Sequence, residues 1–306
     1  MASITNSGTH IDRRSRSVAR IVAASSTIEG GGFEVYRPFP GRAADWFDPF
    51  LLLDEMAPHH QAPGEAIGAP AHPHRGFETV TYILQGEVEH RDSAGHHGVI
   101  GPGDVQWMTA GDGIVHSEMP STRIQTEGGV GHGLQLWVNL PASLRRTPPK
   151  YQALLADDLA SVSGRGWSAE VGAGSMLGTE GPAATHTPLS FARVTIQPGT
   201  TLDIPTTDGH TALVYAFAGT ATIGPAGDEL WAHHLAVLDD DGEAIVLTIA
   251  DDASEPFDCI VLTGEPIGEP MVRYGPFVMN TPAELDEAIS DFRAGRMGTI
   301  PASGTT

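Results

Sequence analysis

The sequence predicts an all-β protein of two tandem β-barrels with one short helix near its C-terminus. Short apolar runs, rich in β-branched and aromatic residues, alternate with turn residues along most of the 306-residue chain. The 37 glycines and 23 prolines favour frequent turns over long helices. The segment Tyr-Ile-Leu-Gln-Gly at 82–86 returns as Tyr-Ala-Phe-Ala-Gly at 215–219, an offset of 133 residues, which indicates one barrel plan used twice.

These patterns divide the chain into four parts. We expect a mobile, polar N-terminal segment at 1–19, a first barrel at 20–145, a second barrel at 146–298 and a disordered tail at 299–306. The segment at 141–151 contains Pro148-Pro149 and is predicted to be the linker between the barrels.

Strands of the first barrel are expected where β-branched and aromatic residues cluster between turn signals. They lie at 21–24, 33–36, 50–53, 79–84, 87–91, 105–109 and 134–140. The proline- and glycine-rich stretch at 57–71 is expected to be a loop. Residues 152–190, rich in Gly, Ala and Ser, are expected to mix short strands with loops.

The helix is predicted at about 281–294, at the end of the second barrel. Thr281-Pro282-Ala283-Glu284 reads as a capping box with proline at the first helical position. Leu285, Ile289 and Phe292 recur at helical spacing and predict one apolar stripe. Gly295 is a suitable stop.

Charge and cysteine content exclude some partners. The formal net charge of −21 repels phosphate backbones and anionic membrane surfaces, which argues against direct nucleic-acid or membrane binding. No stretch of 18 apolar residues predicts a membrane span. A single cysteine, Cys259, allows no internal disulfide and favours a cytoplasmic location. Its neighbours Ile260-Val261-Leu262 predict that the thiol is buried packing.

Two pairs of side chains predict a metal site in the first barrel. His72 and His74 stand two residues apart, and residues i and i+2 of an extended chain point to the same face, so both imidazoles aim at one point. His116 and Glu118 repeat that spacing. Two such pairs on neighbouring strands would give one ion three nitrogens and a carboxylate oxygen. Glu78 shares the parity of the first pair and is an alternative carboxylate.

The other histidines are predicted to have no metal role. The pairs His59-His60, His96-His97 and His233-His234 are adjacent in sequence, so their members face opposite ways in a strand. His90 and His132 are expected at the surface.

The second barrel is predicted to have lost the site. With the offset of 133, His72, His74 and Glu78 correspond to Pro205, Thr207 and Thr211; with an offset of 131, His116 and Glu118 correspond to Leu247 and Ile249. None of these residues is a usual metal ligand.

Long motifs resemble the pirin family, a branch of the cupin superfamily. They are His-Pro-His-Arg-Gly-Phe-Glu-Thr-Val-Thr-Tyr at 72–82 and Gly-Asp-Val-Gln-Trp-Met-Thr-Ala-Gly-Asp-Gly-Ile-Val-His-Ser-Glu-Met-Pro at 103–120. The resemblance continues at 48–52, 134–141, 274–280 and 291–297, and is loose between about 160 and 255. It implies a bicupin, in which each barrel is a double-stranded β-helix. It also favours Glu118 over Glu78 as the fourth ligand, with Glu78 in a supporting position.

Ligand type alone does not fix the metal, because imidazole and carboxylate suit Fe, Mn, Ni, Cu and Zn. Four protein ligands on an octahedral ion leave two adjacent positions open for a substrate oxygen and O2, which favours Fe(II). The resemblance implies iron as well.

The resemblance implies two classes of function. The first is a quercetin 2,3-dioxygenase, in which a flavonol chelates the metal, Glu118 acts as base, and O2 opens the ring with loss of carbon monoxide. Its flat substrate calls for an apolar wall, for which Phe77, Trp107, Met108 and Met119 are candidates; core packing is an equal alternative for Trp107 and Met108. The second is a regulator that binds protein partners without turnover. Its iron would act as a redox switch on the field and surface around Arg75.

Overall fold

The computed structural model describes residues 13–39 and 47–301. Contacts divide the chain into two compact units. Of the described residues, the first barrel contains 26–37, 50–156 and 267–301, and the second barrel contains 13–25, 38–39, 47–49 and 157–266.

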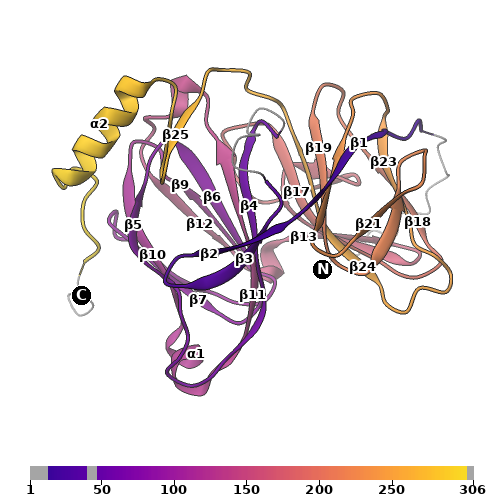
Figure 1. The fold of residues 1–306 in the computed structure, drawn as a ribbon, viewed down its shortest axis with the longest axis horizontal. Coiled ribbons are helices and arrows are strands. Elements are labelled where there is room, and N and C mark those ends of the chain that lie inside the picture. Colours follow the sequence, from indigo (N-terminus) through magenta and orange to yellow (C-terminus); the bar gives the residue numbers. More distant parts are fainter. Residues whose placement is uncertain (1–12, 40–46, 302–306) are drawn as a thin grey trace. The chain divides into compact units, whose positions relative to one another are not determined.

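The first barrel consists of two antiparallel sheets (Figure 1). The larger has the order β12 (Lys150–Leu154), β9 (Val105–Thr109), β6 (Phe77–Gln85), β11 (Gly129–Asn139), β4 (Phe50–Gln61), β3 (Phe33–Arg37) and β2 (Ser25–Glu29). The smaller has the order β5 (Ala69–His74), β10 (Ile114–Pro120), β7 (Val88–Asp92) and β8 (His97–Ile100). Short elements complete this unit: α1 (Thr122–Glu127), a 3-10 turn (Ala142–Leu144), β25 (Val272–Tyr274), β26 (Phe277–Met279) and α2 (Pro282–Arg293).

The second barrel repeats this plan. Its larger sheet has the order β1 (Val18–Ala23), β22 (His234–Leu238), β19 (Thr211–Ala218), β24 (Phe257–Gly264), β17 (Leu189–Ile196), β14 (Trp167–Ala173) and β13 (Ala160–Gly164). Its smaller sheet has the order β18 (Thr201–Pro205), β23 (Ala244–Thr248), β20 (Thr220–Ile223) and β21 (Asp228–Trp231). The hairpin of β15 (Ser175–Met176) and β16 (Thr179–Glu180) and the 3-10 turn Ala156–Asp158 are the remaining described elements. The all-β class and the duplication are therefore confirmed.

The contacts do not follow the contiguous boundaries at 20–145 and 146–298. Strand β1 forms an edge of the second barrel beside β22, and β12, partly in the expected linker, forms the matching edge of the first barrel beside β9. The C-terminal helix α2 belongs to the first barrel, not the second. An edge strand leaves backbone hydrogen-bonding groups unpaired. In each barrel an added strand pairs with one side of the larger sheet: β1 pairs with β22, and β12 pairs with β9.

Two expected irregular segments are ordered. Residues 1–12 lie outside the described residues, but Arg16, expected in a mobile segment, is fully buried in the second barrel and donates to the carbonyls of His210 and Thr207. The expected loop at 57–71 is largely strand, because β4 continues to Gln61 and β5 begins at Ala69. Helix α1 was not expected; the Ser121 side chain caps it by accepting from the Ile124 amide.

The C-terminal helix forms as predicted, with Thr281 and Glu284 completing the capping box. Leu285 and Ile289 pack on a small core that includes Val115, but Phe292 is 39% exposed and Asp291 is buried in its place. Asp291 can be buried because Arg75 and Arg296 donate to it. Of the expected tail, Ile300 packs on the same core, and residues 302–306 lie outside the described part.

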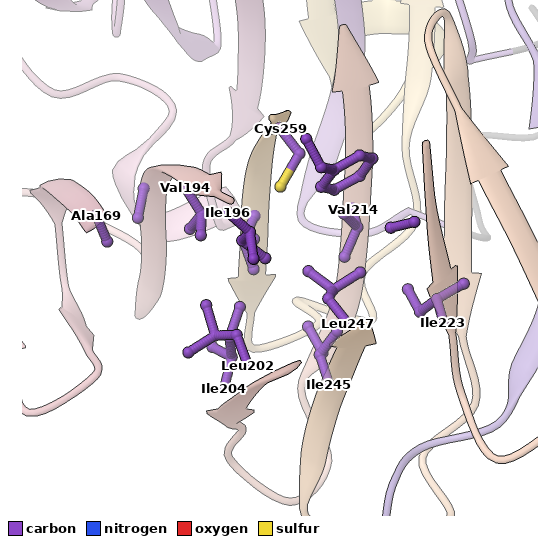
Figure 2. Packing of buried hydrophobic residues seen from close by; sticks show 14 of the residues in the cluster. Ala169, Val194, Ile196, Leu202, Ile204, Val214, Ile223, Ile245, Leu247 and Cys259 are labelled. Atoms are coloured by element: carbon purple, nitrogen blue, oxygen red, sulfur yellow. The ribbon is translucent and has the colours of Figure 1, made fainter. Parts of the chain in front are cut away.

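The interior of the second barrel is apolar (Figure 2). Leu202 pairs with Leu247 across β18 and β23, as His72 pairs with His116 across β5 and β10. The residues matching His72 and His74 are therefore Leu202 and Ile204, and the expected match to Pro205 and Thr207 is wrong. The offset is 130 here and 133 at Tyr82 and Tyr215, because the chain between these points is three residues longer in the second barrel.

Candidate metal centre

Three histidines converge inside the first barrel. His72 and His74 lie on β5, and the antiparallel register of β5 with β10 places His116 opposite His72. Nε2 of His72 is 3.1 Å from Nε2 of His74 and 2.9 Å from Nε2 of His116. Among the described residues, these three form the group whose ligand atoms lie close enough together to hold a metal ion.

Backbone carbonyls orient the imidazoles. Nδ1 of His72 lies 2.7 Å from the carbonyl oxygen of Pro70, and Nδ1 of His74 lies 3.4 Å from that of Pro276. If Nδ1 carries the proton that each carbonyl accepts, the Nε2 lone pairs face one another. Nitrogens about 2.1 Å from one ion and about 90° apart would lie about 3.0 Å from each other, so the observed spacing fits a shared ion.

Burial favours the neutral form of two of these imidazoles, those of His74 and His116. His74 is 3% exposed and His116 is fully buried. Desolvation lowers the pKa of His74 well below its usual value, and the neighbouring His72 acts in the same direction. Desolvation likewise lowers the pKa of His116, with contributions from His74 and His72. A neutral imidazole is the form that binds a metal, so the donor set fits the group predicted from the sequence.

Glu118 lies near this cluster but not in it. Its Oε1 accepts from Thr81 Oγ1 at 2.7 Å and from Gln106 Nε2 at 2.8 Å, and its Oε2 is 3.5 Å from Gln135 Nε2. The pairing of β10 with β5 also shifts register between His116 and Glu118. The structure thus brings together three of the four predicted ligands, and coordination by Glu118 stays a prediction.

Glu78 occupies a different environment. It is fully buried and accepts a hydrogen bond from Thr109 Oγ1 at 2.7 Å. Thr109 lies directly opposite Glu78, on the neighbouring strand β9. The expected shared parity with His72 does not hold, because β5 and β6 belong to different sheets and Arg75-Gly76 turns the chain between them. The face of β6 that meets the cavity carries Thr81 and Ile83.

A cavity of about 630 Å³ opens beside His72 and His74, between the two sheets of the first barrel. Its apolar wall includes Leu52, Met56, Ile83, Trp137 and Pro120, and its polar groups include Arg37, Asp54, Thr81, Glu118, Gln135 and Arg273. The Trp137 ring lies 5.2 Å from the His74 ring, and the Arg273 guanidinium lies 4.5 Å from the centre of the Trp137 ring.

The four wall residues predicted from the sequence do not line this cavity. Phe77, Trp107 and Met108 are fully buried, as the core alternative expects, and Met119 is half-buried on β10. Phe77 contributes indirectly, because its ring supports Trp137 at 4.3 Å.

Comparison with known proteins places the chain in a family. The family described as Pirin matches residues 32–138, and the Pirin C-terminal cupin domain matches residues 191–298. A pirin-like protein from Arabidopsis thaliana is 42% identical over 288 residues, covering 92% of this chain and 90% of that protein. Human pirin is 39% identical over 287 residues, covering 93% of this chain and 94% of pirin.

The chain belongs to the pirin family. A crystal structure of quercetin 2,3-dioxygenase from Acinetobacter baumannii is similar to it with a TM-score of 0.88 at 40% identity, covering 94% of this chain and all of that one (100%). Among the described residues, no helix is long and apolar enough to cross a membrane.

Several residues in or beside this site were not predicted from the sequence. Gln135 and Trp137 are two residues apart in Leu-Gln-Leu-Trp on β11 and therefore share one face of the strand. The sequence does not indicate which face of the strand lines the cavity. His90, expected at the surface, is fully buried, and its ring lies 5.4 Å from that of His116. His132 is also largely buried and lies 3.0 Å from Oε1 of Glu55.

Proposed function

We propose that this protein is a metal-dependent dioxygenase of the quercetin 2,3-dioxygenase type, which opens a flavonol ring with O2 at one iron ion. The observation that carries the proposal is the convergence of three imidazoles, two of which, those of His72 and His74, line a cavity of about 630 Å³. That volume is in the range of sites for small organic ligands. The similarity to a structure described as quercetin 2,3-dioxygenase supports the choice of chemistry.

The histidines would hold the metal, which when bound supplies a Lewis acid and a centre that reacts with O2. Three imidazoles with open positions and a nearby carboxylate favour Fe(II), although Mn, Ni, Cu and Zn share these ligands. Nδ1 hydrogen bonds from His72 and His74 to the backbone fix the rings before the ion arrives.

Glu118 is proposed to remove the proton of the flavonol 3-hydroxyl. Its carboxylate is part of the cavity lining, and Thr81 and Gln106 orient it by donating to Oε1. Within the described part of the chain, Oε2 has only a long contact to Gln135, so this oxygen is the one available to a substrate proton or to the ion. Glu78 would support the wall through Thr109 without meeting the substrate.

The apolar lining has a second role. Leu52, Met56, Ile83 and Trp137 surround the polar groups and would exclude water when a flat aromatic ligand fills the cavity. Trp137 also touches the His74 ring, so a ligand stacked on it would lie directly beside the histidines.

The test is metal analysis of purified protein together with O2 uptake and CO release on quercetin. We expect iron-loaded protein to consume O2 and release CO in equal amounts, and metal-free protein to do neither. Quercetin binding without O2 uptake at full iron occupancy would contradict the proposal. The regulator alternative receives no support from Arg75, which is 3% exposed and held by Asp291.

A further inference from the structure

A row of polar side chains crosses the larger sheet of the first barrel. Gln106 on β9 is directly opposite Thr81 on β6, Thr81 is opposite Gln135 on β11, and Gln135 is opposite Asp54 on β4. Residues paired in this way share one face of a sheet. Arg37 on β3 continues the row by donating to both carboxylate oxygens of Asp54, at 2.6 and 2.5 Å.

This polar row faces the cavity and connects its two ends. Thr81, Gln135, Asp54 and Arg37 all line the cavity. At one end Thr81 donates to Glu118, and at the other Arg37 donates to Glu29 at 2.7 Å. The neighbouring positions on the same strands are apolar: Leu52 and Met56 flank Asp54, and Trp137 and Gly133 flank Gln135. Polar groups buried in an apolar wall lower the stability of the fold unless they form hydrogen bonds.

The row keeps hydrogen-bonding capacity that the protein does not use. Gln135 Oε1 lies 2.7 Å from Thr81 Oγ1, but the single proton of that hydroxyl is donated to Glu118. Among the described residues, Gln135 Nε2 has only the 3.5 Å contact to Glu118, although an amide nitrogen carries two protons. Each oxygen of Asp54 receives one bond from Arg37, whereas a carboxylate can accept about four. Strands lie about 4.8 Å apart, so these groups face the cavity at regular steps.

We propose that the polar row selects the substrate, as a planar aromatic that carries hydroxyl groups along the edge facing Gln135 and Asp54. Phenolic protons would be donated to Asp54 and to Gln135 Oε1, and a phenolic oxygen would accept from Gln135 Nε2. This inference rests on the proposed function, because it assumes that the metal-chelating end of the same molecule lies at the histidines. A site built to bind hydroxyl groups rejects the analogue that lacks them, since its own polar groups then stay unpaired.

The experiment compares two ligands that share the chelating 3-hydroxy-4-keto unit: 3-hydroxyflavone, and quercetin, which adds hydroxyl groups on both outer rings. Binding to metal-loaded protein is measured anaerobically by tryptophan fluorescence, so no turnover is needed. We expect wild type to prefer quercetin. Gln135→Leu should weaken quercetin binding by about tenfold and change 3-hydroxyflavone binding by less than about twofold. Asp54→Asn should act in the same direction, and Gln152→Leu on β12, outside the cavity lining, should leave both affinities unchanged.

The ratio of the two affinities is the decisive reading, because a purely structural role for the row would weaken both ligands equally. Equal losses in Gln135→Leu, or a wild type that binds both ligands alike, would overturn the inference. If both flavonols are also cleaved at equal rates, the proposed dioxygenase activity is supported and the proposed selection by the polar row is rejected. If quercetin binds more tightly but no O2 is consumed, the proposed selection is supported and the dioxygenase activity is rejected.

Discussion

The two barrels have the same strand order but differ in the side chains that occupy their interiors. In the first barrel the paired positions on the smaller sheet carry His72 and His116; in the second they carry Leu202 and Leu247. His74 has its counterpart in Ile204, which is fully buried in an apolar cluster (Figure 2). The comparison shows that the ligand positions are ordinary core positions of this fold, so the plan of the barrel does not itself require a metal.

The difference extends to the space around these positions. The second barrel closes over its interior with Val, Ile, Leu and Ala side chains. The first barrel leaves a cavity of about 630 Å³ with a row of polar groups on one wall. Unfilled volume and buried imidazoles both lower stability relative to close apolar packing. The first barrel thus has the features of a site, and the second those of a scaffold.

The largest expected effect comes from removing one imidazole. His74→Ala takes away a nitrogen that faces Nε2 of His72 at 3.1 Å, so metal content should fall close to zero while the fold persists. Elemental analysis and circular dichroism measure the two quantities. A variant that purifies with full metal would show that the ligand assignment is wrong. Wild type saturated with iron should hold one ion per chain, and tight binding of a second would contradict the comparison of the barrels.

The two carboxylates of the first barrel should differ in effect. Glu118→Gln keeps shape but removes charge and proton affinity, so ring cleavage at saturating iron should fall by about 10²–10⁴-fold. Glu78→Gln, which alters a buried carboxylate bonded to Thr109, should reduce turnover much less and act mainly on stability. Steady-state O2 uptake compares them, with iron content checked in each sample. Loss of turnover in Glu78→Gln but not in Glu118→Gln would reverse their assigned roles.

A core deletion tests the scaffold barrel. Leu247→Ala should lower the free energy of unfolding by about 2–5 kcal/mol, because Leu247 is fully buried opposite Leu202. Metal content should not change, since the ligands belong to the other barrel. Denaturant titration gives the first quantity. Leu155→Ala, at a residue of the first barrel that is 48% exposed, is a control for the loss of an exposed leucine and should change stability by under about 0.5 kcal/mol. Metal loss in Leu247→Ala would mean that the two barrels do not act separately.

Local patterns in the sequence predict much of this fold. Histidines two apart, a capping box at Thr281 and the return of Tyr82-type motifs at Tyr215 all depend on neighbours within a few residues. What they miss is set by distant segments. The position of the Glu118 carboxylate depends on Thr81, Gln106 and Gln135 from three other strands. Which strand covers which barrel edge is likewise a matter of pairing between remote parts of the chain.

The smallest expected effect is the change in stability when the sulfur of Cys259, in the second barrel, is replaced. Cys259 is fully buried among apolar side chains (Figure 2), and burial raises the pKa of its thiol well above the usual value. Cys259→Ser keeps the size but adds a hydroxyl among apolar neighbours, so it should destabilise by about 1–3 kcal/mol. Cys259→Ala, which adds no polar group, should lower stability by about 1 kcal/mol. Denaturant midpoints compare the two, and native wild type should resist alkylation until it unfolds, because the thiol is neither exposed nor ionised. Serine tolerated as well as alanine, or rapid alkylation of the native protein, would show that the second barrel is less tightly closed than its packing indicates.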